Sequence, residues 1–496
     1  MLKHVLPEEV GVRSEDVHAL VSSLVKRKIH MHSLLLMRGD KIFLDSYWAP
    51  FHKDRPHRMY SVTKSFVSVV VGLAVEDGLV DLDRRIASYF PDKIGEPLSE
   101  WLAAQTVRDM LTMTTVGGPH GWFSARAEDR TRFYFEDAVA SRPSGTAWQY
   151  DSAGSQVLSS LVERVTGKRL FDYLNERIFR TLGAFSSAKI LSTPNGDSWG
   201  DSAMICTPRD LAAFARFVMN YGTWGGERLM NEEYLRLATS AVVSNAEDGH
   251  SSMLNHGYGY QFWRTEKDGF AFVGLGDQLA VCMPKQDLIM VCTADNQGNG
   301  WQRQYLMAQF MDLIVDRAWE SPLPPNDVET QRLRELVDSL TLHAAVGAED
   351  SPLREEIDGA VYTCLENPLT WKNFSFRFEG AEGGELRYTN ARGEMTLPFS
   401  INRNRFGTFP ELGYSREYGG VRTTDGHRYD DAVSAAWLQE NKLLIFVQII
   451  DDYFGNLSLI FSFKNDMAVV TATKNAEDFL WDYKGEIVAK REDVTP

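Results

Sequence analysis

The chain has 496 residues, which at about 100–200 residues per domain predicts two or three domains. Hydrophobic residues make up 44% and charged residues 24%, an ordinary globular composition that excludes a wholly disordered chain. The formal net charge of −16 argues against nucleic acid and anionic membranes as partners, because both are polyanions.

The apolar segments and the cysteines exclude further classes. The longest apolar stretch, residues 66–75, is shorter than the run of about 18 residues that spans a bilayer. The N-terminal segment lacks the apolar centre and cleavage site of a signal peptide, so we expect a cytoplasmic protein. The four cysteines are scattered without CxxC spacing, which predicts reduced thiols and no zinc site.

The first elements along the chain are a hairpin and a helix. Residues 33–47 contain two apolar runs joined by Gly39 and Asp40, a turn signal that predicts a β-hairpin. Residues 61–75 are long enough for a helix, and Gly78 supplies its stop.

A second helix and a group of strands follow. Thr207 as N-cap and Pro208 in the first turn predict a helix with an apolar stripe of helical period. Three aromatic and β-branched runs then predict antiparallel strands, because only short turns separate them. These runs cover residues 256–263, 269–283 and 287–295.

A proline-rich segment at residues 319–327 predicts a linker, and a short helix is expected over residues 331–342. From about residue 355 the chain alternates like short strands, which predicts a barrel or a sandwich. The expected strands lie within 373–380, 384–390, 394–400, 441–450, 456–464 and 467–473.

The expected fold class is therefore α+β, with an antiparallel sheet flanked by helices and a C-terminal all-β, barrel-like domain. The expected boundaries are residues 1–322 for the first domain, 323–345 for the linker and short helix, and 346–496 for the β-rich domain.

The sharpest chemical feature is Ser61-Val-Thr-Lys64 at the start of the predicted helix. Residues three apart lie on one helix face, so the lysine can serve the serine hydroxyl as a base. The same spacing recurs at Ser23 and Ser186 without matching context, and its ordinary interpretation is an N-cap serine beside an exposed lysine.

The surrounding segments add specificity. His57-Arg-Met-Tyr-Ser-Val-Thr-Lys is followed by Val107-Arg-Asp-Met-Leu-Thr-Met-Thr-Thr and by Pro143-Ser-Gly-Thr-Ala-Trp-Gln-Tyr-Asp-Ser. In this order they resemble the serine β-lactamase/penicillin-binding-protein superfamily, over roughly residues 5–318. Within it the chain is similar to the class C-like serine hydrolases, a family of esterases, D-aminopeptidases and 6-aminohexanoate-oligomer hydrolases. The resemblance implies a β-lactamase/transpeptidase-like fold for the first domain.

The resemblance also implies roles for single residues. Ser61 corresponds to the acylated nucleophile and Lys64 to its base partner. Tyr150 occupies the second motif, as a proton relay to the leaving group, and Ser152 helps to hold that network. The alternative interpretation of Tyr150 is a half-buried aromatic residue of the core.

The third motif departs from the family pattern. Where the family has Lys or His, then Thr or Ser, then Gly, this chain has Phe272-Val273-Gly274. Gly274 still allows a close backbone approach, and the N–H groups of Ser61 and Leu275 could form an oxyanion hole. Val273 is expected to face the substrate. The missing cation disfavours substrate carboxylates, and therefore favours neutral esters or small amides.

Other residues near the expected cleft are weaker candidates. Trp122 and Phe123 follow the predicted helix around Met110, in a region that borders the substrate cleft in the resembling family. Asp151 is expected to be solvated. A rival nucleophile is Ser198 in Gly196-Asp-Ser-Trp-Gly200, but the strand and helix that flank an α/β-hydrolase elbow are not predicted around it.

The sequence therefore predicts a serine hydrolase that cleaves a small-molecule or short-peptide ester or amide, with no metal and no organic cofactor. Acyl transfer by the same serine and a non-catalytic, penicillin-binding-like protein remain alternatives. The resemblance leads us to expect a lipocalin-like C-terminal domain that limits access to the cleft or builds a homodimer.

Overall fold

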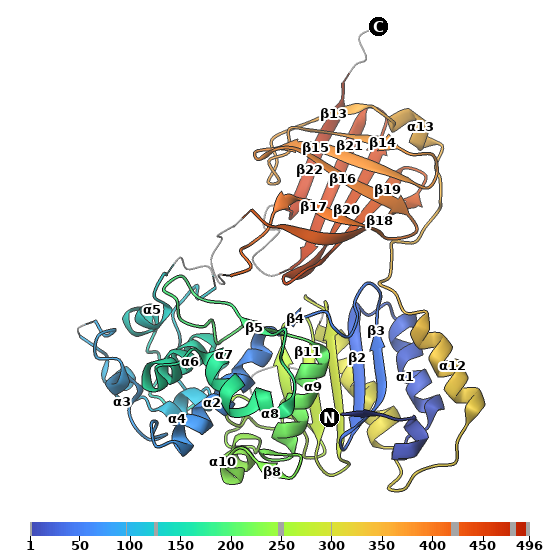
Figure 1. The fold of residues 1–496 in the computed structure, drawn as a ribbon. Coiled ribbons are helices and arrows are strands. Elements are labelled where there is room, and N and C mark those ends of the chain that lie inside the picture. The colour runs from blue at the N-terminus through green and yellow to red at the C-terminus, as the bar shows by residue number, and fades with distance from the viewer. Residues whose placement is uncertain are drawn as a thin grey trace. The chain divides into compact units, whose positions relative to one another are not determined.

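The structure is a computed structural model that describes residues 2–95, 97–123, 127–246, 252–298, 300–417, 426–476 and 483–492. The chain divides into two compact units (Figure 1). The first comprises residues 2–341 together with Glu417, and the second the remaining described residues from 342 onward.

An open sheet forms the centre of the first unit. Among the described residues, seven strands form it in the order β1-β3-β2-β12-β11-β10-β9, antiparallel apart from the β1–β3 pair. The strands are β1 (Lys3–His4), β2 (Met31–Arg38), β3 (Lys41–Tyr47), β9 (Trp263–Arg264), β10 (Phe270–Gly274), β11 (Gln278–Met283) and β12 (Leu288–Ala294). The β2–β12 pair joins segments about 250 residues apart, with Leu288 opposite Arg38.

Helices surround this sheet. Helix α9 packs on β2, β11 and β12, while α1 packs on α11 and α12 (Figure 1). The helical elements are η1 (Pro7–Val10), α1 (Ser14–Lys26), η2 (Tyr60–Val62), α2 (Thr63–Glu76), η3 (Ile86–Tyr89), α3 (Glu100–Ala104), α4 (Val107–Leu111), α5 (Arg130–Asp137), α6 (Ser152–Thr166), α7 (Leu170–Leu174), η4 (Asn175–Phe179), α8 (Arg180–Leu182), α9 (Pro208–Met219), α10 (Glu232–Ala238), α11 (Gly300–Phe310), η5 (Met311–Val315) and α12 (Asp327–Asp338). Small sheets add β4 (His57–Arg58), β5 (Lys189–Ile190), β6 (Met204–Cys206), β7 (Thr223–Trp224) and β8 (Glu227–Arg228).

The local signals of the first unit are largely confirmed. The hairpin turns at Gly39, whose φ of +57° suits glycine, and α9 begins with the predicted Thr207 capping box. The strand expected over residues 256–263 is wrong, because only β9 forms there and Gln261 has a φ of +64°. The helix expected over 331–342 is α12 (Asp327–Asp338), and it lies in the first unit.

The second unit is a closed barrel. In its described part, β13 to β16 and β18 to β22 form a ring of nine strands, which a β16–β18 pairing closes, and β17 adds to β18 outside the ring. Helix α13 (Leu353–Ile357) precedes it. The strands are β13 (Val361–Cys364), β14 (Asn373–Phe378), β15 (Gly383–Asn390), β16 (Gly393–Ile401), β17 (Arg405–Leu412), β18 (Arg428–Gln439), β19 (Lys442–Ile450), β20 (Phe454–Lys464), β21 (Met467–Asn475) and β22 (Gly485–Arg491).

The barrel interior is filled by aromatic side chains. The ring centre of Phe376 lies 4.9–6.4 Å from those of several neighbouring rings, and these rings are buried. They belong to Phe374, Phe399, Phe461 and Phe463. This packing and the alternating strand pattern confirm the barrel-like interpretation of the sequence.

Candidate active site

A tight turn delivers Ser61 to the end of a buried helix. Strand β4 pairs with β6, and the chain then turns at Tyr60, whose φ of +47° is unusual for a residue with a side chain. Ser61 lies in η2, one residue before the end of this short segment, and α2 continues from Thr63. The nucleophile expected at a helix start therefore lies in a 3₁₀ turn just ahead of the helix, and it stays partly exposed.

Lys64 is positioned one turn further along and is buried, with only 1% of its surface exposed. Its Nζ donates to Ser61 Oγ at 2.9 Å and to the backbone carbonyl of Asp201 at 2.7 Å. The predicted pairing of serine and lysine is therefore present in the structure. A hydrogen-bonded amine at this distance can take the hydroxyl proton as the serine attacks.

The ring of Tyr150 lies next to the amine of Lys64. Lys64 Nζ lies 5.0 Å from the centre of the Tyr150 ring, which itself stacks on Trp263 at 5.7 Å. Trp148 adds a third ring, 6.5 Å from Tyr150. Within the described residues the Tyr150 hydroxyl makes no hydrogen bond, and its ring is half-buried. The three residues of the first two motifs thus lie together, as the resemblance implies.

The residues after Tyr150 begin α6. Ser152 is the first residue of this helix and is half-buried. Asp151 is its N-cap, accepts hydrogen bonds from Gly154 N at 3.1 Å and Thr115 Oγ1 at 2.7 Å, and is buried. The expectation of a solvated Asp151 is therefore wrong. Burial raises the pKa of its carboxyl, although the hydrogen bonds and the nearby Lys64 oppose this.

The third motif approaches the nucleophile closely. A Cβ added to Gly274 would lie 2.4 Å from the carbonyl oxygen of Met59, two residues before Ser61, so only glycine fits there. Val273 is buried in β10, whereas Leu275 is 40% exposed in the turn that follows. Phe272 takes the place of the family's cation and is fully buried. The strand thus lies beside the serine without offering a positive charge.

The two aromatic candidates differ in how far they are exposed. Phe123 is 48% exposed, while Trp122 is 6% exposed and donates from Nε1 to Asp201 Oδ2 at 2.6 Å. Contact of either residue with a substrate stays a prediction. The structure links Trp122 instead to the residue whose carbonyl holds Lys64.

The rival nucleophile Ser198 is contradicted by its surroundings. Its Oγ donates to Glu163 at 2.6 Å, and its backbone N–H donates to the same carboxylate at 3.0 Å. Ser198 is 1% exposed, and the segment that carries it has neither a strand directly before it nor a helix directly after it. An α/β-hydrolase elbow requires both. Ser198 therefore has a structural role.

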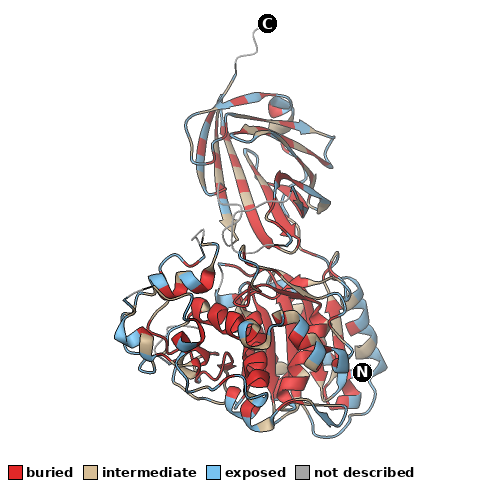
Figure 2. Cartoon of the chain, turned by 60° about the vertical axis from the view of Figure 1, so that its left-hand side comes forward, coloured by how far each residue is buried: buried red, intermediate tan, exposed pale blue. Residues whose placement is uncertain are grey.

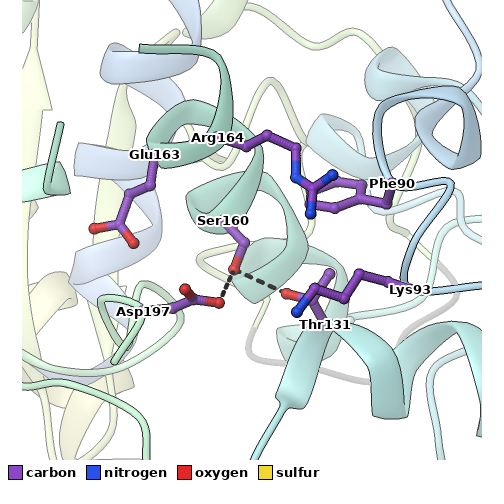
Figure 3. Close-up of a pocket in the computed structure, with 7 residues that line it drawn as sticks. All are labelled: Phe90, Lys93, Thr131, Ser160, Glu163, Arg164 and Asp197. Atoms are coloured by element: carbon purple, nitrogen blue, oxygen red, sulfur yellow. Dashed lines mark hydrogen bonds between the residues drawn. The ribbon is translucent and has the colours of Figure 1, made fainter. Parts of the chain in front are cut away.

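A separate pocket of about 410 Å³ lies beside this segment (Figure 3). Ser160 bridges two of its lining residues, since Thr131 donates to it at 2.8 Å and it donates to Asp197 at 3.2 Å. Arg164 pairs with Asp92 at 2.5 Å. The lining consists of Phe90, Lys93, Thr131, Ser160, Glu163, Arg164 and Asp197. Lys93 and Glu163 likewise bind residues outside the lining, Asp129 and Ser198. These polar groups of the pocket therefore serve in structural contacts.

Comparison with known proteins decides the family. The beta-lactamase family model matches residues 17–307, more than half of the chain. The chain belongs to the beta-lactamase family. The 6-aminohexanoate-dimer hydrolase of Paenarthrobacter ureafaciens is 27% identical over 306 residues, which are 58% of this chain and 78% of that protein.

Similarity to solved structures concerns the fold. A Bacillus anthracis protein described as a "putative 6-aminohexanoate-dimer hydrolase" aligns with a TM-score of 0.50 at 16% identity, covering 60% of this chain and 80% of its own. The octameric penicillin-binding protein homologue from Pyrococcus abyssi aligns with a TM-score of 0.49 at 15% identity, covering 96% and 100%. The family and the named relative indicate a hydrolase of the beta-lactamase-like superfamily.

For this member of the beta-lactamase family the described residues add three findings. None of their helices is long and apolar enough to cross a membrane. No three of their His, Cys, Asp and Glu side chains cluster as metal ligands would. The four cysteines are free thiols, three of them buried.

Two contributors to the beta-lactamase-like site carry no sequence signal. Asp201 comes to Lys64 from 137 residues along the chain, through its backbone carbonyl, which any residue could supply. Gln261 accepts from Ser65 through its carbonyl and from Ser155 through its side chain, and so joins α2 to α6. Only the tertiary fold reveals both residues.

Proposed function

We propose that this protein is a serine hydrolase that cleaves an ester or amide of a small molecule or short peptide through an acyl-enzyme on Ser61. The observation that carries the proposal is the buried Lys64, whose Nζ lies 2.9 Å from the hydroxyl oxygen of the partly exposed Ser61. A buried amine aimed at an accessible hydroxyl is the arrangement that an activated nucleophile needs.

The proposed reaction has two halves. Ser61 Oγ attacks the substrate carbonyl while Lys64 accepts its proton, and the N–H groups of Ser61 and Leu275 stabilise the tetrahedral oxyanion. Tyr150 passes a proton to the leaving group, and a covalent ester on Ser61 remains. A water molecule then attacks this ester through the same groups and releases the acid.

The third motif supports a neutral substrate. Phe272 is buried where the family pattern has a cation, so a substrate carboxylate finds no partner from this strand. The relative named 6-aminohexanoate-dimer hydrolase supports a small substrate with a cleavable acyl bond. We therefore favour small, neutral esters and amides over β-lactams and peptidoglycan fragments. Transfer of the acyl group to an acceptor other than water remains open to the same machinery.

The test is the intact mass of the protein after incubation with a fluorophosphonate, which labels activated serines. We expect one label on the wild type and on Ser198→Ala, and none on Ser61→Ala. A wild type without label would overturn the hydrolase and favour a non-catalytic, ligand-binding protein. A label that disappears in Ser198→Ala would assign the nucleophile to Ser198.

The appended β-domain leads us to propose a homodimer as well. Sedimentation equilibrium of the full chain would give twice the 56.1 kDa of one chain if this holds. A mass of one chain across the concentration range would exclude it.

A further inference from the structure

The second hydrogen bond of Lys64 depends on a turn without regular structure. Its Nζ donates to Ser61 Oγ and, at 2.7 Å, to the carbonyl of Asp201. Residues 200–202 form a turn between the isolated bridge residue Ser198 and strand β6. No helix or strand ladder fixes this carbonyl, so side chains must hold it in place.

The side chain of Asp201 has one such anchor. It is fully buried, and its Oδ2 accepts from the indole Nε1 of Trp122 at 2.6 Å. Its Oδ1 has no hydrogen-bond donor among the described residues. The guanidinium of Arg130 adds a favourable charge interaction with this carboxylate, but the indole is its one hydrogen-bond donor among the described residues, so the direction of the carboxylate depends on that N–H.

Trp122 is itself held on several sides. The guanidinium of the buried Arg130 lies 4.8 Å from the centre of its ring, and the Nη1 of Arg130 donates to its carbonyl at 3.0 Å. Phe133 stacks on the indole at 5.8 Å with the planes 10° apart. The indole N–H is therefore presented in a fixed direction.

Helix α6 holds the other side of the turn. Gly200 N donates to Gln156 Oε1 at 2.9 Å, and a Cβ on Gly200 would lie 2.2 Å from Ser159 Cβ. With Trp122 on one side and α6 on the other, the carbonyl of Asp201 has little freedom to move.

The geometry points to Trp122 as a positioning residue of the proposed hydrolase: its indole N–H fixes Asp201, whose carbonyl holds the amine of Lys64 against Ser61. This inference rests on the proposed function. In this role Trp122 acts through the turn at Asp201 rather than on a reacting atom. Misplacement of a catalytic group by about 1 Å can lower a rate as much as 100-fold, so the anchor is a sensitive point.

The test measures the second-order rate constant of fluorophosphonate labelling between pH 5 and 10, with KM and kcat on p-nitrophenyl acetate. Trp122→Phe keeps a ring and loses the donor, and we expect labelling about 10-fold slower, kcat lowered by a similar factor and KM changed less than about twofold. Asp201→Ala should lower the labelling rate and kcat by the same factors as Trp122→Phe does. The double variant should be no slower than either single one, because both remove the same link.

Two controls separate anchoring from packing and charge. Phe133→Leu weakens the stack that helps to orient the indole but keeps the N–H donor, so its labelling rate should fall clearly less than that of Trp122→Phe. Asp201→Asn removes the charge and keeps an oxygen that can accept from Trp122, so we expect it to label more than threefold faster than Asp201→Ala. Circular dichroism and Tm establish that each variant is folded. If Trp122→Phe does not fold, the comparison of the labelling rates of Asp201→Asn and Asp201→Ala tests the inference instead.

Several outcomes would overturn the inference. These are a Trp122→Phe variant that labels at the wild-type rate, single effects that multiply in the double variant, or an Asp201→Asn variant as slow as Asp201→Ala. A wild type that takes no label on Ser61, or a Lys64→Ala variant as fast as the wild type, would instead overturn the proposed function. The two failures are therefore distinguishable.

Discussion

The two units bury their strands in different ways. In the first unit β10, β11 and β12 are buried along their whole length, while in the barrel β14 and β21 alternate between buried and less buried residues (Figure 2). The first pattern indicates a sheet covered on both faces, and the second a sheet with one face toward solvent. The two units also differ in the side chains that surround their buried centres.

Beside the sheet of the first unit, buried charged groups gather around one serine. Lys64, Asp151 and Asp201 are each less than 9% exposed, and Arg58 and Arg130 are nearly inaccessible. In the barrel, the interior around Phe376 is aromatic. Burial of charge is expensive, but the barrel buries carboxyls as well, at Glu411, Asp431 and Asp451. The functional site is therefore indicated by the pairing of the buried Lys64 with the accessible Ser61, whereas the aromatic interior of the barrel indicates a role in stability.

The largest effect is expected from removal of the buried amine of Lys64. We expect Lys64→Ala to lower the rate of fluorophosphonate labelling by about 10²–10⁴, the usual range for loss of a general base. Lys93→Ala is the matched control, because that lysine pairs with Asp129 outside the Ser61 site. Equal labelling of the two variants would remove the functional interpretation of the buried charge.

A core substitution in the barrel should act on stability alone. Phe461 is fully buried, 4.9 Å from the ring of Phe376, so Phe461→Ala should lower the free energy of unfolding by about 3–5 kcal/mol. Urea unfolding followed by hydrogen exchange of barrel peptides measures this loss. Phe406→Ala, at a residue 54% exposed, should change it by less than about 1 kcal/mol. A folded Phe461→Ala protein that labels at a reduced rate would contradict the separation of roles.

In the barrel, the titration of the buried carboxyl of Asp431 tests how strongly its surroundings disfavour charge. Burial raises the pKa of Asp431 to about 7, with Asp430 adding to the shift and the N–H of Gly407 opposing it. The folded protein therefore keeps this proton between about pH 4 and pH 7, where the unfolded chain has lost it. The contribution of Asp431 to stability is present at low pH and is lost as the pH rises through this window.

Asp431→Asn cannot ionise, so it should gain stability relative to the wild type as the pH rises from 4 to 8. We expect the difference to grow by about 2–4 kcal/mol, measured by urea unfolding of β18 and β19 peptides under hydrogen exchange. A difference that stays constant with pH would show that this side chain titrates normally.

The smallest effect is expected at Ser198. Removal of its hydroxyl leaves Glu163 without one of its hydrogen bonds, so Ser198→Ala should lose about 1–2 kcal/mol of stability and keep its labelling rate. Chemical denaturation measures the loss, and Ser244→Ala, at an exposed position, is the control. A stability equal to that of the wild type would mean that this segment is held by its other contacts.

Much of the fold follows from local patterns. Alternating apolar residues place strands such as β14, β15 and β19 within a few residues, and the cap at Thr207 starts α9 where expected. The strand expected over residues 256–263 is rich in aromatic residues, yet only Trp263 of it lies in a strand, and Gln261 adopts a left-handed conformation and bonds to α4 and α6. Tertiary contacts there override propensity.

The candidate site also contains residues that local patterns reveal and residues that only tertiary contacts reveal. Ser61, Lys64 and Tyr150 stand in motifs of characteristic spacing, so a sequence can reveal them. Asp201 contributes a backbone carbonyl and Trp122 an indole N–H, and neither depends on a spacing that a pattern records. The burial of Asp151 is likewise a product of packing, because its partner Thr115 comes from 36 residues earlier in the chain.

The pairing of β2 with β12 has a consequence for the synthesis of the chain. Met31–Arg38 meets its partner only when Leu288–Ala294 has been made. At about 5–20 residues per second the ribosome needs roughly 12–50 s for the intervening 250 residues. During that interval a strand that is buried over seven of its eight residues in the folded protein has one edge without a neighbour, which is a surface prone to aggregation. The nascent hydrolase unit is therefore a natural client for chaperones until residue 294 has emerged, before most of the barrel exists.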